Sequence, residues 1–356
     1  MLRTIGLMSG TSLDGVDAAW LETDGVSLGR FGPSLTIPYD DRLQTDLRSI
    51  LDRAPTLPAD DPALADAVRR LTEVHIQAVR ALNIGADVIG FHGQTILHQP
   101  ERRRTWQVGD ADLLARETGI PVAFDFRSAD VAAGGQGAPL VPVFHQALAA
   151  GLERPLVILN IGGVANVTWI GEDDALVAFD TGPGNGPLDD WVLAHTQAGF
   201  DRDGALAIAG TADPAILAKL RAHPYFDRRG PKSLDRLDFA AAIAGSGLRH
   251  LSAADGAATL TAFTAAAVAA AQLPAPPRRW LVCGGGRHNP AIMAALRAAL
   301  RGPVEPVESV GWDGDALEAQ CFGLLAARVL AGLALSYPAT TGVVRPMAGG
   351  RISRAG

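Results

Sequence analysis

The sequence predicts an α/β chain of two domains, each built on a mixed sheet, with a ligand cleft between the halves. A short apolar strand, a turn and a returning strand occur around Gly10 and again around Gly162 and Gly163. In both halves three strands are followed by helix, strand, helix and strand, the order of a unit with parallel and antiparallel neighbours. The length of 356 residues suits two domains of ordinary size. Two unrelated hairpins remain an alternative explanation of the repeated turn.

The first half begins with an apolar run that ends at Gly10, and the spacing of apolar residues predicts its other elements. Short alternating or continuous apolar runs predict strands, and apolar residues that recur with helical spacing predict helices. The expected strands are residues 16–21, 28–37, 87–91, 105–108 and 121–124. The expected helices are residues 42–51, 62–82 and 111–118. The Gly- and Pro-rich segment from Gly134 to Pro142 is expected to separate the domains.

The second half repeats these patterns in the same order. Its expected strands are residues 156–161, 164–170, 175–179 and 280–283. Its expected helices are residues 187–196, 257–271, 291–300 and 317–333. We therefore expect a first domain over residues 1–150, a second over residues 151–340 and a tail over residues 341–356.

Charge and composition argue against several classes of protein. The formal net charge of −7 argues against a general nucleic-acid binder. The longest apolar candidate for a membrane span, Ala257 to Ala271, is interrupted by threonines and predicts a buried helix instead. The N-terminus lacks the pattern of a secretory signal, and Cys283 and Cys321 have no metal-ligand spacing. A cytoplasmic protein without a membrane or nucleic-acid partner is therefore expected.

The turn after the first apolar run is a candidate phosphate site. Gly10 and Gly15 permit close approach to the backbone, and Thr11 and Ser12 add two hydroxyl groups. Backbone N–H groups in such a turn can bind phosphate oxygens. The turn differs from the lysine-containing phosphate loop, because no lysine follows and the next element is a strand. An ordinary hairpin turn is the alternative.

Two further glycine-rich segments follow strands of the second half. Asp180 lies at a strand end, where it would be held rigidly, and Gly182 and Gly184 beyond it leave space for a ligand. A helix that begins near Pro187 would offer free N–H groups to phosphate. Three consecutive glycines from Gly284 would suit an adenine or ribose that lies against bare backbone. Ordinary capping and turn roles are the alternatives in both segments.

Polar side chains also follow two strands of the first half, and one carboxylate opens the last helix. The polar residues are His92, Gln94 and Thr95 after one strand and Asp125, Arg127 and Asp130 after the next. They suit a hydroxylated ligand with a carboxylate or amide group. A metal site is less attractive, because no second histidine stands at helical spacing from the first. Glu318 opens the last helix, where stabilisation of the helix dipole is the alternative to a functional role.

Taken together and in order, seven segments resemble the anhydro-N-acetylmuramic acid kinase family, part of the sugar kinase–actin superfamily. The matching segments are Gly-Leu-Met-Ser-Gly-Thr-Ser-Leu-Asp-Gly from Gly6, Phe-His-Gly-Gln-Thr from Phe91, Asp-Phe-Arg from Asp125 with Asp130 and Gly-Gly-Gln-Gly-Ala-Pro-Leu-Val-Pro from Gly134, Asn-Ile-Gly-Gly-Val-Ala-Asn from Asn160, Phe-Asp-Thr-Gly-Pro-Gly-Asn from Phe179, Pro-Lys-Ser from Pro231 and Cys-Gly-Gly-Gly from Cys283. A small departure at Gly186-Pro187-Leu188, where the family commonly has bulkier apolar residues, touches a helix start and leaves Asp180 in place.

The resemblance implies a two-domain, actin-like and ribonuclease-H-like fold with duplicated mixed sheets and a central cleft. It implies a homodimeric kinase that uses ATP and Mg²⁺ and acts on 1,6-anhydro-N-acetylmuramic acid, a product of cell-wall turnover. In the implied reaction water opens the anhydro bridge at the anomeric carbon while O6 accepts the γ-phosphoryl group. The products are N-acetylmuramic acid 6-phosphate and ADP.

The resemblance also implies roles for individual residues. Asp180 would be the base that activates water, Glu318 would orient the water or support Asp180, and Asp14 would be a partner of hydrated Mg²⁺. The residues implied on the nucleotide side are Gly10, Thr11, Ser12, Leu13, Asp14, Gly15, Val16, Asp17, Gly162, Gly163, Gly182, Gly184, Asn185, Gly284, Gly285 and Gly286. Those implied on the sugar side are His92, Gln94, Thr95, Asp125, Arg127 and Asp130, with Arg127 meeting the lactyl carboxylate.

Two other functions stay open from the sequence. One is ordinary phosphoryl transfer to a hexose or amino sugar, which requires no added water. The other is a nucleotide-switched sensor of the same fold that performs no chemistry, since fold alone does not decide function. The presence of Asp180 and Glu318 argues against the sensor.

Overall fold

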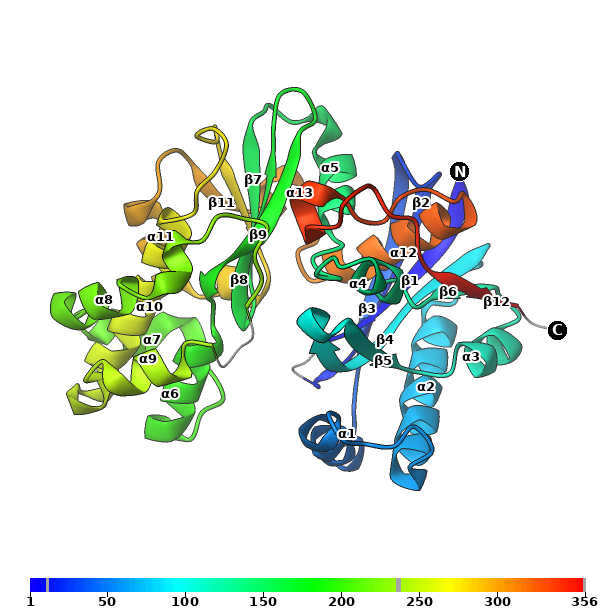
Figure 1. Cartoon of the computed structure of the whole chain (residues 1–356), viewed down its shortest axis with the longest axis horizontal. Coiled ribbons are helices and arrows are strands. Elements are labelled where there is room, and N and C mark those ends of the chain that lie inside the picture. The colour runs from blue at the N-terminus through cyan, green and yellow to red at the C-terminus, as the bar shows by residue number, and fades with distance from the viewer. Residues whose placement is uncertain (11–12, 235–237, 355–356) are drawn as a thin grey trace. The chain divides into compact units, whose positions relative to one another are not determined.

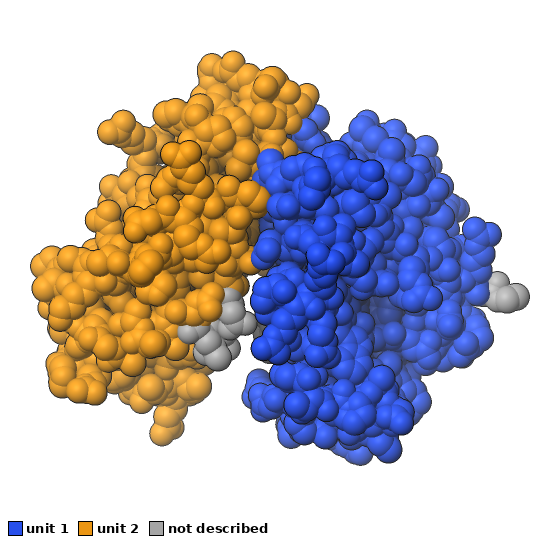
Figure 2. Space-filling view, viewed as in Figure 1, with its two compact units in different colours: residues 1–150, 316–356 blue, residues 151–315 orange. Residues whose placement is uncertain are grey.

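The computed structural model describes residues 1–10, 13–234 and 238–354 of the chain. These residues form two compact units (Figure 2): unit 1 contains residues 1–150 and 316–356, and unit 2 contains residues 151–315. Unit 1 runs to residue 150, which is also the limit expected for the first domain and lies beyond the segment from Gly134 to Pro142. The division differs from the expected domains at the other end, because the chain returns to unit 1 at Ala316 instead of staying in the second domain to residue 340.

The sheet of unit 1 combines an antiparallel meander with parallel strands. Its strands are β1 (Leu2–Ser9), β2 (Gly15–Thr23), β3 (Leu28–Pro38), β4 (Val88–Gln99), β5 (Arg104–Val108), β6 (Val122–Phe124) and β12 (Arg351–Ser353). The order is β12-β6-β4-β1-β2-β3, with β5 paired to the far half of β4. β1, β4 and β6 run parallel, whereas β2, β3, β5 and β12 are antiparallel to their neighbours.

Helices cover the sheet of unit 1 (Figure 1). They are α1 (Asp41–Arg53), α2 (Pro62–Leu82), α3 (Ala111–Thr118), α4 (Ser128–Ala132), α5 (Pro142–Leu148), α12 (Leu317–Leu330) and α13 (Pro338–Thr341). Short 3₁₀ turns lie at Pro100–Arg102 and Ala149–Gly151. The first two long helices begin at aspartates, Asp40 and Asp61, whose carboxylates accept N–H groups of the first turn. The apolar faces of these helices pack on the sheet and form the core of the unit.

Helix α12 lies against the sheet of unit 1 at glycine positions. A Cβ atom on Gly6 of β1 would lie 1.7 Å from the carbonyl oxygen of Ala319, and one on Gly90 of β4 would lie 1.9 Å from that of Phe322. Helix and strand backbones are therefore nearly in contact. This close packing explains why the last long helix belongs to unit 1, although the sequence order suggested the second domain.

Unit 2 repeats the topology of unit 1. Its strands are β7 (Leu156–Ile161), β8 (Val164–Ile170), β9 (Leu176–Pro183), β10 (Trp280–Cys283) and β11 (Val304–Pro306), in the order β11-β10-β7-β8-β9. β7, β8 and β9 form an antiparallel meander, and β10 and β11 extend it in parallel. The order β6-β4-β1-β2-β3 of unit 1 is the same arrangement. The expected duplicated mixed sheets of the actin-like class are thus confirmed.

The helices of unit 2 enclose a second core that is rich in aromatic residues. They are α6 (Gly186–Thr196), α7 (Ala205–Ala209), α8 (Pro214–Arg221), α9 (Ala240–Gly245), α10 (Ala253–Ala269) and α11 (Pro290–Ala299). Short 3₁₀ turns lie at Arg202–Gly204, Pro224–Asp227, Leu248–His250, Gly285–His288 and Val307–Val310. Within the described part of the chain, no helix has both the length and the apolar character needed to span a membrane.

Candidate functional site

Asp180 lies in β9 and is held by the segment that follows α8. Its carboxylate Oδ2 accepts the N–H of Leu234 at 2.8 Å, and its own N–H donates to the carbonyl of Lys232 at 2.9 Å. The hydroxyl of Tyr225 donates to the Asp180 carbonyl at 2.5 Å. Backbone and side chain are therefore both fixed. Asp180 lies within β9 rather than at its end, because the strand continues to Pro183 instead of ending at residue 179 as expected.

The surroundings of Asp180 favour its neutral form more than water does. Burial raises the pKa of its carboxyl group to about 7, against the opposing effects of the Leu234 N–H and the Lys232 ammonium group. A carboxyl group with such a pKa is divided between its two protonation states near neutral pH. It can therefore accept a proton and release it again, which suits a general base.

The glycines around β7, β8 and β9 pack mainly against one another. The N–H of Asn185 donates to the carbonyl of Gly162 at 2.6 Å, and those of Gly184 and Gly186 donate to the carbonyl of Gly163. A Cβ on Gly184 would lie 2.1 Å from the Gly162 oxygen. The N–H groups of Gly184, Asn185 and Gly186, which lead into α6, are thus engaged within the protein rather than free for phosphate.

Some residues in the turns that follow β7 and β9 keep free space or a free hydrogen-bonding atom among the described residues. A Cβ on Gly163 would meet nothing within 4 Å, so a ligand has room beside it, whereas one on Gly182 would lie 2.6 Å from the Ala267 side chain of α10. The Oδ1 atom of Asn185 is buried and has no hydrogen-bond partner among the described residues. Gly163 and Asn185 therefore have capacity for a ligand, as does Gly162, where a Cβ would meet only the Val164 carbonyl oxygen at 3.6 Å.

The triple-glycine turn after β10 is anchored by an arginine that the sequence analysis did not single out. Arg287 donates to the Gly284 carbonyl at 3.0 Å and forms ion pairs with Glu308 and Asp315, each at 2.8 Å. Its side chain is only 3% exposed. A Cβ on Gly286 would lie 2.2 Å from the Ile161 side chain, so packing explains this glycine, while Gly285 is exposed and open to a ligand.

The turn between β1 and β2 is tied to β4 in unit 1. The Gly10 carbonyl accepts the Gln94 side-chain amide at 3.1 Å and the Leu13 N–H at 3.2 Å, and the Ser9 hydroxyl donates to the Gly93 carbonyl at 3.0 Å. Thr11 and Ser12 lie outside the described residues.

Several nucleotide-side candidates in this turn have structural roles. Leu13 and Val16 are buried in the core, and a Cβ on Gly15 would lie 2.4 Å from the carbonyl oxygen of Ile37 in β3. Among the described residues of the turn, Asp14 is the exposed candidate.

Three carboxylates of unit 1 influence one another. The pKa of Glu318 is raised, first by its crowded surroundings and then by Asp17 and Asp14, while Arg127 opposes the shift. The Glu318 side chain nonetheless remains reachable by solvent. Asp17 also accepts the Thr36 hydroxyl at 2.6 Å. Mutual repulsion of this kind is relieved when a cation binds. Among the described residues, however, no group of three acidic, histidine or cysteine side chains has the arrangement of a preformed metal site.

His92 and Arg127 form a buried pair rather than two separate ligand groups. The Nδ1 atom of His92 lies 2.7 Å from the Gly93 carbonyl, and its Nε2 accepts the Nε–H of Arg127 at 3.0 Å. An arginine only donates, so the imidazole is neutral with its proton on Nδ1. Burial and the Arg127 charge hold the pKa of His92 well below its usual value. Arg127 also donates to the Gly137 carbonyl at 2.8 Å.

Both carboxylate oxygens of Asp130 accept hydrogen bonds from the protein, although the sequence suggested that this residue binds the substrate. Its Oδ1 accepts the Gly137 N–H at 2.6 Å, and its Oδ2 accepts the hydroxyls of Ser336 and Thr341. The residue is only 2% exposed. These bonds join the glycine-rich loop after α4 to the C-terminal segment, which leaves Asp130 little capacity to bind a sugar.

Gln94 and Thr95 lie within β4, not beyond its end, because the strand continues to Gln99. Gln94 is fully buried and its Nε2 donates to Gly10, while the Thr95 hydroxyl accepts the Gln107 side chain at 3.1 Å. The sequence prediction ended this strand early because polar residues begin at His92. Pairing with β5 explains the continuation.

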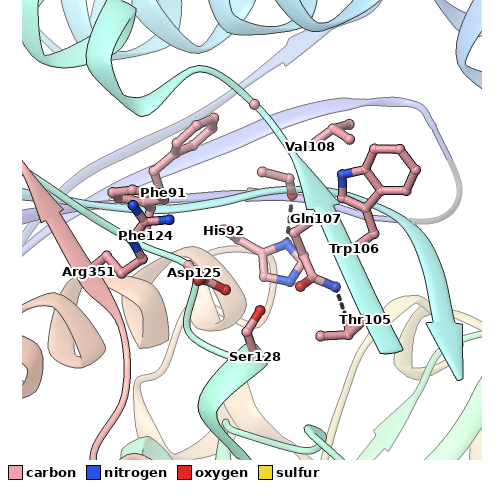
Figure 3. Close-up of a pocket in the computed structure, with 12 residues that line it drawn as sticks. Phe91, His92, Thr105, Trp106, Gln107, Val108, Phe124, Asp125, Ser128 and Arg351 are labelled. Atoms are coloured by element: carbon pink, nitrogen blue, oxygen red, sulfur yellow. Dashed lines mark hydrogen bonds between the residues drawn. The ribbon is translucent and has the colours of Figure 1, made fainter. Parts of the chain in front are cut away.

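A pocket of about 220 Å³ lies in unit 1, beside the region of β4 where its pairing changes from β6 to β5 (Figure 3). The side chains of His92, Gln107, Asp125 and Ser128 gather in it, as Figure 3 shows. The other lining residues are Phe91, Gly93, Thr105, Trp106, Val108, Gly109, Phe124 and Arg351. The pocket thus combines aromatic rings with hydrogen-bonding groups, as small-molecule sites commonly do.

The match to known proteins extends over the whole chain. The family model described as anhydro-N-acetylmuramic acid kinase matches residues 2–355. A protein of that name from Acidiphilium cryptum is 64% identical over 355 residues, which cover 100% of this chain and 99% of the relative. Relatives of the same name from Paramagnetospirillum magneticum and Gluconobacter oxydans are 57% and 56% identical, with at least 98% of both chains covered. The chain belongs to the anhydro-N-acetylmuramic acid kinase family.

Membership in the anhydro-N-acetylmuramic acid kinase family makes the chain a kinase and supports ATP as the phosphoryl donor. The structure adds residues to the candidate site that sequence reasoning did not assign. Trp106 and Arg351 line the pocket of unit 1, with the Arg351 guanidinium 5.1 Å from the ring centre of Phe124. Arg351 was missed because the C-terminal segment was expected to be a tail, whereas β12 pairs with β6.

Proposed function

We propose that the chain uses ATP to convert 1,6-anhydro-N-acetylmuramic acid into N-acetylmuramic acid 6-phosphate and ADP. Water adds to the anomeric carbon, the bond from that carbon to O6 breaks, and O6 takes the γ-phosphoryl group. The observation that supports this proposal best is the fixed Asp180 carboxyl group with its pKa raised to about 7. Ordinary phosphoryl transfer to a sugar hydroxyl needs positioning more than it needs such a base.

In the proposed reaction Asp180 removes a proton from the attacking water. Neutral water is a weak nucleophile, and a positioned base typically contributes about 10²–10⁴-fold to such a step. The Leu234 N–H fixes one carboxylate oxygen at 2.8 Å, which leaves the other for the water. We further propose that Glu318, an exposed residue at the start of α12, assists this step.

We propose that the sugar occupies the pocket of unit 1. Asp125, Ser128 and Gln107 would bind its polar substituents, and Trp106 and Phe124 would contact its apolar face. Arg351 is the cation that lines this pocket, so it is the better candidate for the lactyl carboxylate. Arg127, the earlier candidate, already donates to His92 and Gly137.

The residues in the β1–β2 turn fit a hydrated Mg²⁺ that accompanies ATP. Asp14 is exposed and acts together with Asp17 to raise the pKa of Glu318, so a cation would be stabilised near these carboxylates. Asp14 would hold the ion through its water shell, and the ion would neutralise charge on the phosphates. In unit 2, Gly163, Asn185 and Gly285 would contact the nucleotide.

A homodimeric state, a cytoplasmic location and a place in cell-wall recycling form part of the same proposal. They rest on the family resemblance and on the proposed substrate, which arises from peptidoglycan.

The proposed base predicts a specific pH dependence. Since only the carboxylate form of Asp180 accepts a proton, kcat/KM for the anhydro sugar should fall about tenfold per pH unit below about pH 7. ADP release at saturating Mg-ATP, measured from pH 5.5 to 9, checks this. Circular dichroism at each pH serves as the folding control. A flat profile down to pH 5.5 in folded enzyme would exclude Asp180 as the base.

A further inference from the structure

The segment Pro231-Lys232-Ser233 matches the family pattern, yet the proposed reaction assigns it no task. The sequence contains only two lysines, Lys219 and Lys232, among 31 basic residues, so arginine supplies nearly all of its positive charge. Lys219 is exposed on α8, whereas Lys232 is only 8% exposed. Burying a lysine ammonium group costs free energy unless hydrogen bonds or opposite charges stabilise it.

The ammonium group of Lys232 lies in an aromatic pocket beside Asp180. Its Nζ donates to the Tyr225 carbonyl at 3.1 Å and lies 4.2 Å from the centre of the Tyr225 ring. The Phe179 ring, next to Asp180 in β9, is 5.9 Å away. No ion pair joins Lys232 to another described residue, and such contacts can retain a desolvated cation.

The backbone of the same segment encloses Asp180. The Lys232 carbonyl accepts the Asp180 N–H, the Leu234 N–H donates to the carboxylate, and Tyr225, which holds the ammonium group, donates its hydroxyl to the Asp180 carbonyl. Placement of the Lys232 side chain and placement of Asp180 thus depend on the same turn.

Lys232 and Asp180 also influence each other's charge. Burial and Arg228 lower the pKa of Lys232, and Asp180 and Asp227 oppose this. Tyr225 stays neutral, because burial and Asp180 raise the pKa of its hydroxyl; Arg228 opposes that shift and Asp238 adds to it. Among the described residues, the positive groups near Asp180 are Lys232 and, next to Tyr225, Arg228 at 5.5 Å from the ring centre.

We infer that Lys232 is a positioning residue for the proposed base: its backbone fixes Asp180, and its buried ammonium group favours the carboxylate form. This inference rests on the proposed function. The lysine cation offsets part of the burial cost of the carboxylate, so that a share of Asp180 is ionised in neutral solution and is still basic enough to accept a proton.

Lysine NMR tests the charge coupling without measuring activity. Protein labelled with ¹³C at the lysine ε-carbon should give two lysine signals, which Lys219→Met assigns. Replacing Asp180 by Asn should lower the midpoint of the Lys232 titration by roughly half a pH unit or more, because a neighbouring negative charge is lost. The Lys219 midpoint should not move. An unchanged Lys232 midpoint in D180N would overturn the inference.

Kinetics test the consequence for the base. In Lys232→Met the acid limb of the kcat/KM profile should move up by roughly half to one pH unit, with activity recovering near pH 9. Lys232→Arg should restore the limb toward its wild-type position, and Lys219→Met should leave it unchanged. A uniform loss at every pH with an unmoved limb would mean that Lys232 is merely structural.

The two tests separate this inference from the proposed function. If D180N retains full turnover, Asp180 is not the base, whatever the lysine titration shows. If D180N is inactive and the acid limb of Lys232→Met is unmoved, the base is correct and the inference is wrong. Should Lys232→Met fail to fold, the lysine titration in D180N decides.

Discussion

Replacing Asp180 by asparagine should lower kcat by about 10²–10⁴-fold, the usual contribution of a positioned general base. Asparagine has nearly the same shape, and its side-chain oxygen can still accept the Leu234 N–H that now binds the carboxylate at 2.8 Å. The loss should therefore arise from chemistry, with the KM for ATP little changed. ADP release coupled to a spectrophotometric signal measures both constants.

Asp203→Asn is the matched control for the Asp180 variant. Asp203 lies in the same unit, is exposed, and has a positive φ of 56° that asparagine tolerates. This variant should retain wild-type turnover. If D180N kept more than half of the wild-type kcat, another group would have to activate the water.

Replacing Gly6 by alanine should lower the free energy of unfolding by at least about 2 kcal/mol, because the added methyl group overpacks a closed interface. The new Cβ would lie 1.7 Å from the Ala319 carbonyl oxygen and 2.5 Å from the Gly323 nitrogen, both backbone atoms of α12. Backbone atoms cannot move aside as a flexible side chain can. The helix must shift away from the sheet of unit 1. Urea unfolding followed by circular dichroism measures the loss.

Gly85→Ala provides the control in the same unit. The nearest atom to its added Cβ would be the end of the Arg3 side chain at 3.6 Å, which is ordinary contact. Its stability should stay close to wild type. Equal stability of Gly6→Ala and wild type would show that α12 does not pack on β1 as described.

The elements with strong periodicity could be predicted from the sequence. β7, β8 and the helix that became α2 agree with their expected limits, because each has a single apolar pattern bounded by glycine, proline or a capping aspartate. The repeated strand–turn–strand pattern correctly predicted two mixed sheets.

The long-range arrangement could not be predicted. The sequence of residues 317–330 contains no signal that this helix packs on glycines more than 200 positions earlier in the chain. The short strand β12 has only three residues, too few for a periodic signal, and depends on its partner β6. Contacts with distant segments decide both cases.

The candidate site was predicted in part for the same reason. The motif around Asp180 singled out this residue and placed it next to a strand, but β9 continues past it to Pro183. The pKa of its carboxyl group was not predictable, because burial raises it and the Leu234 N–H and the Lys232 ammonium group, both more than 50 positions later in the chain, oppose that shift. For Asp130 the prediction was wrong in its role. Its position in the motif indicated a substrate-binding residue, but its carboxylate binds Ser336 and Thr341, which lie over 200 positions later in the chain.

A trace of solvent oxygen tests the central claim, that water activated by a carboxylate opens the anhydro bridge. The reaction is run with ATP in H₂¹⁸O, quenched early and analysed by fragmentation mass spectrometry, with unlabelled product in the same water as the control for exchange. We predict one ¹⁸O on the anomeric carbon of N-acetylmuramic acid 6-phosphate and none in its phosphoryl group. Product that lacks the anomeric label, or that carries it on phosphorus, would contradict the account.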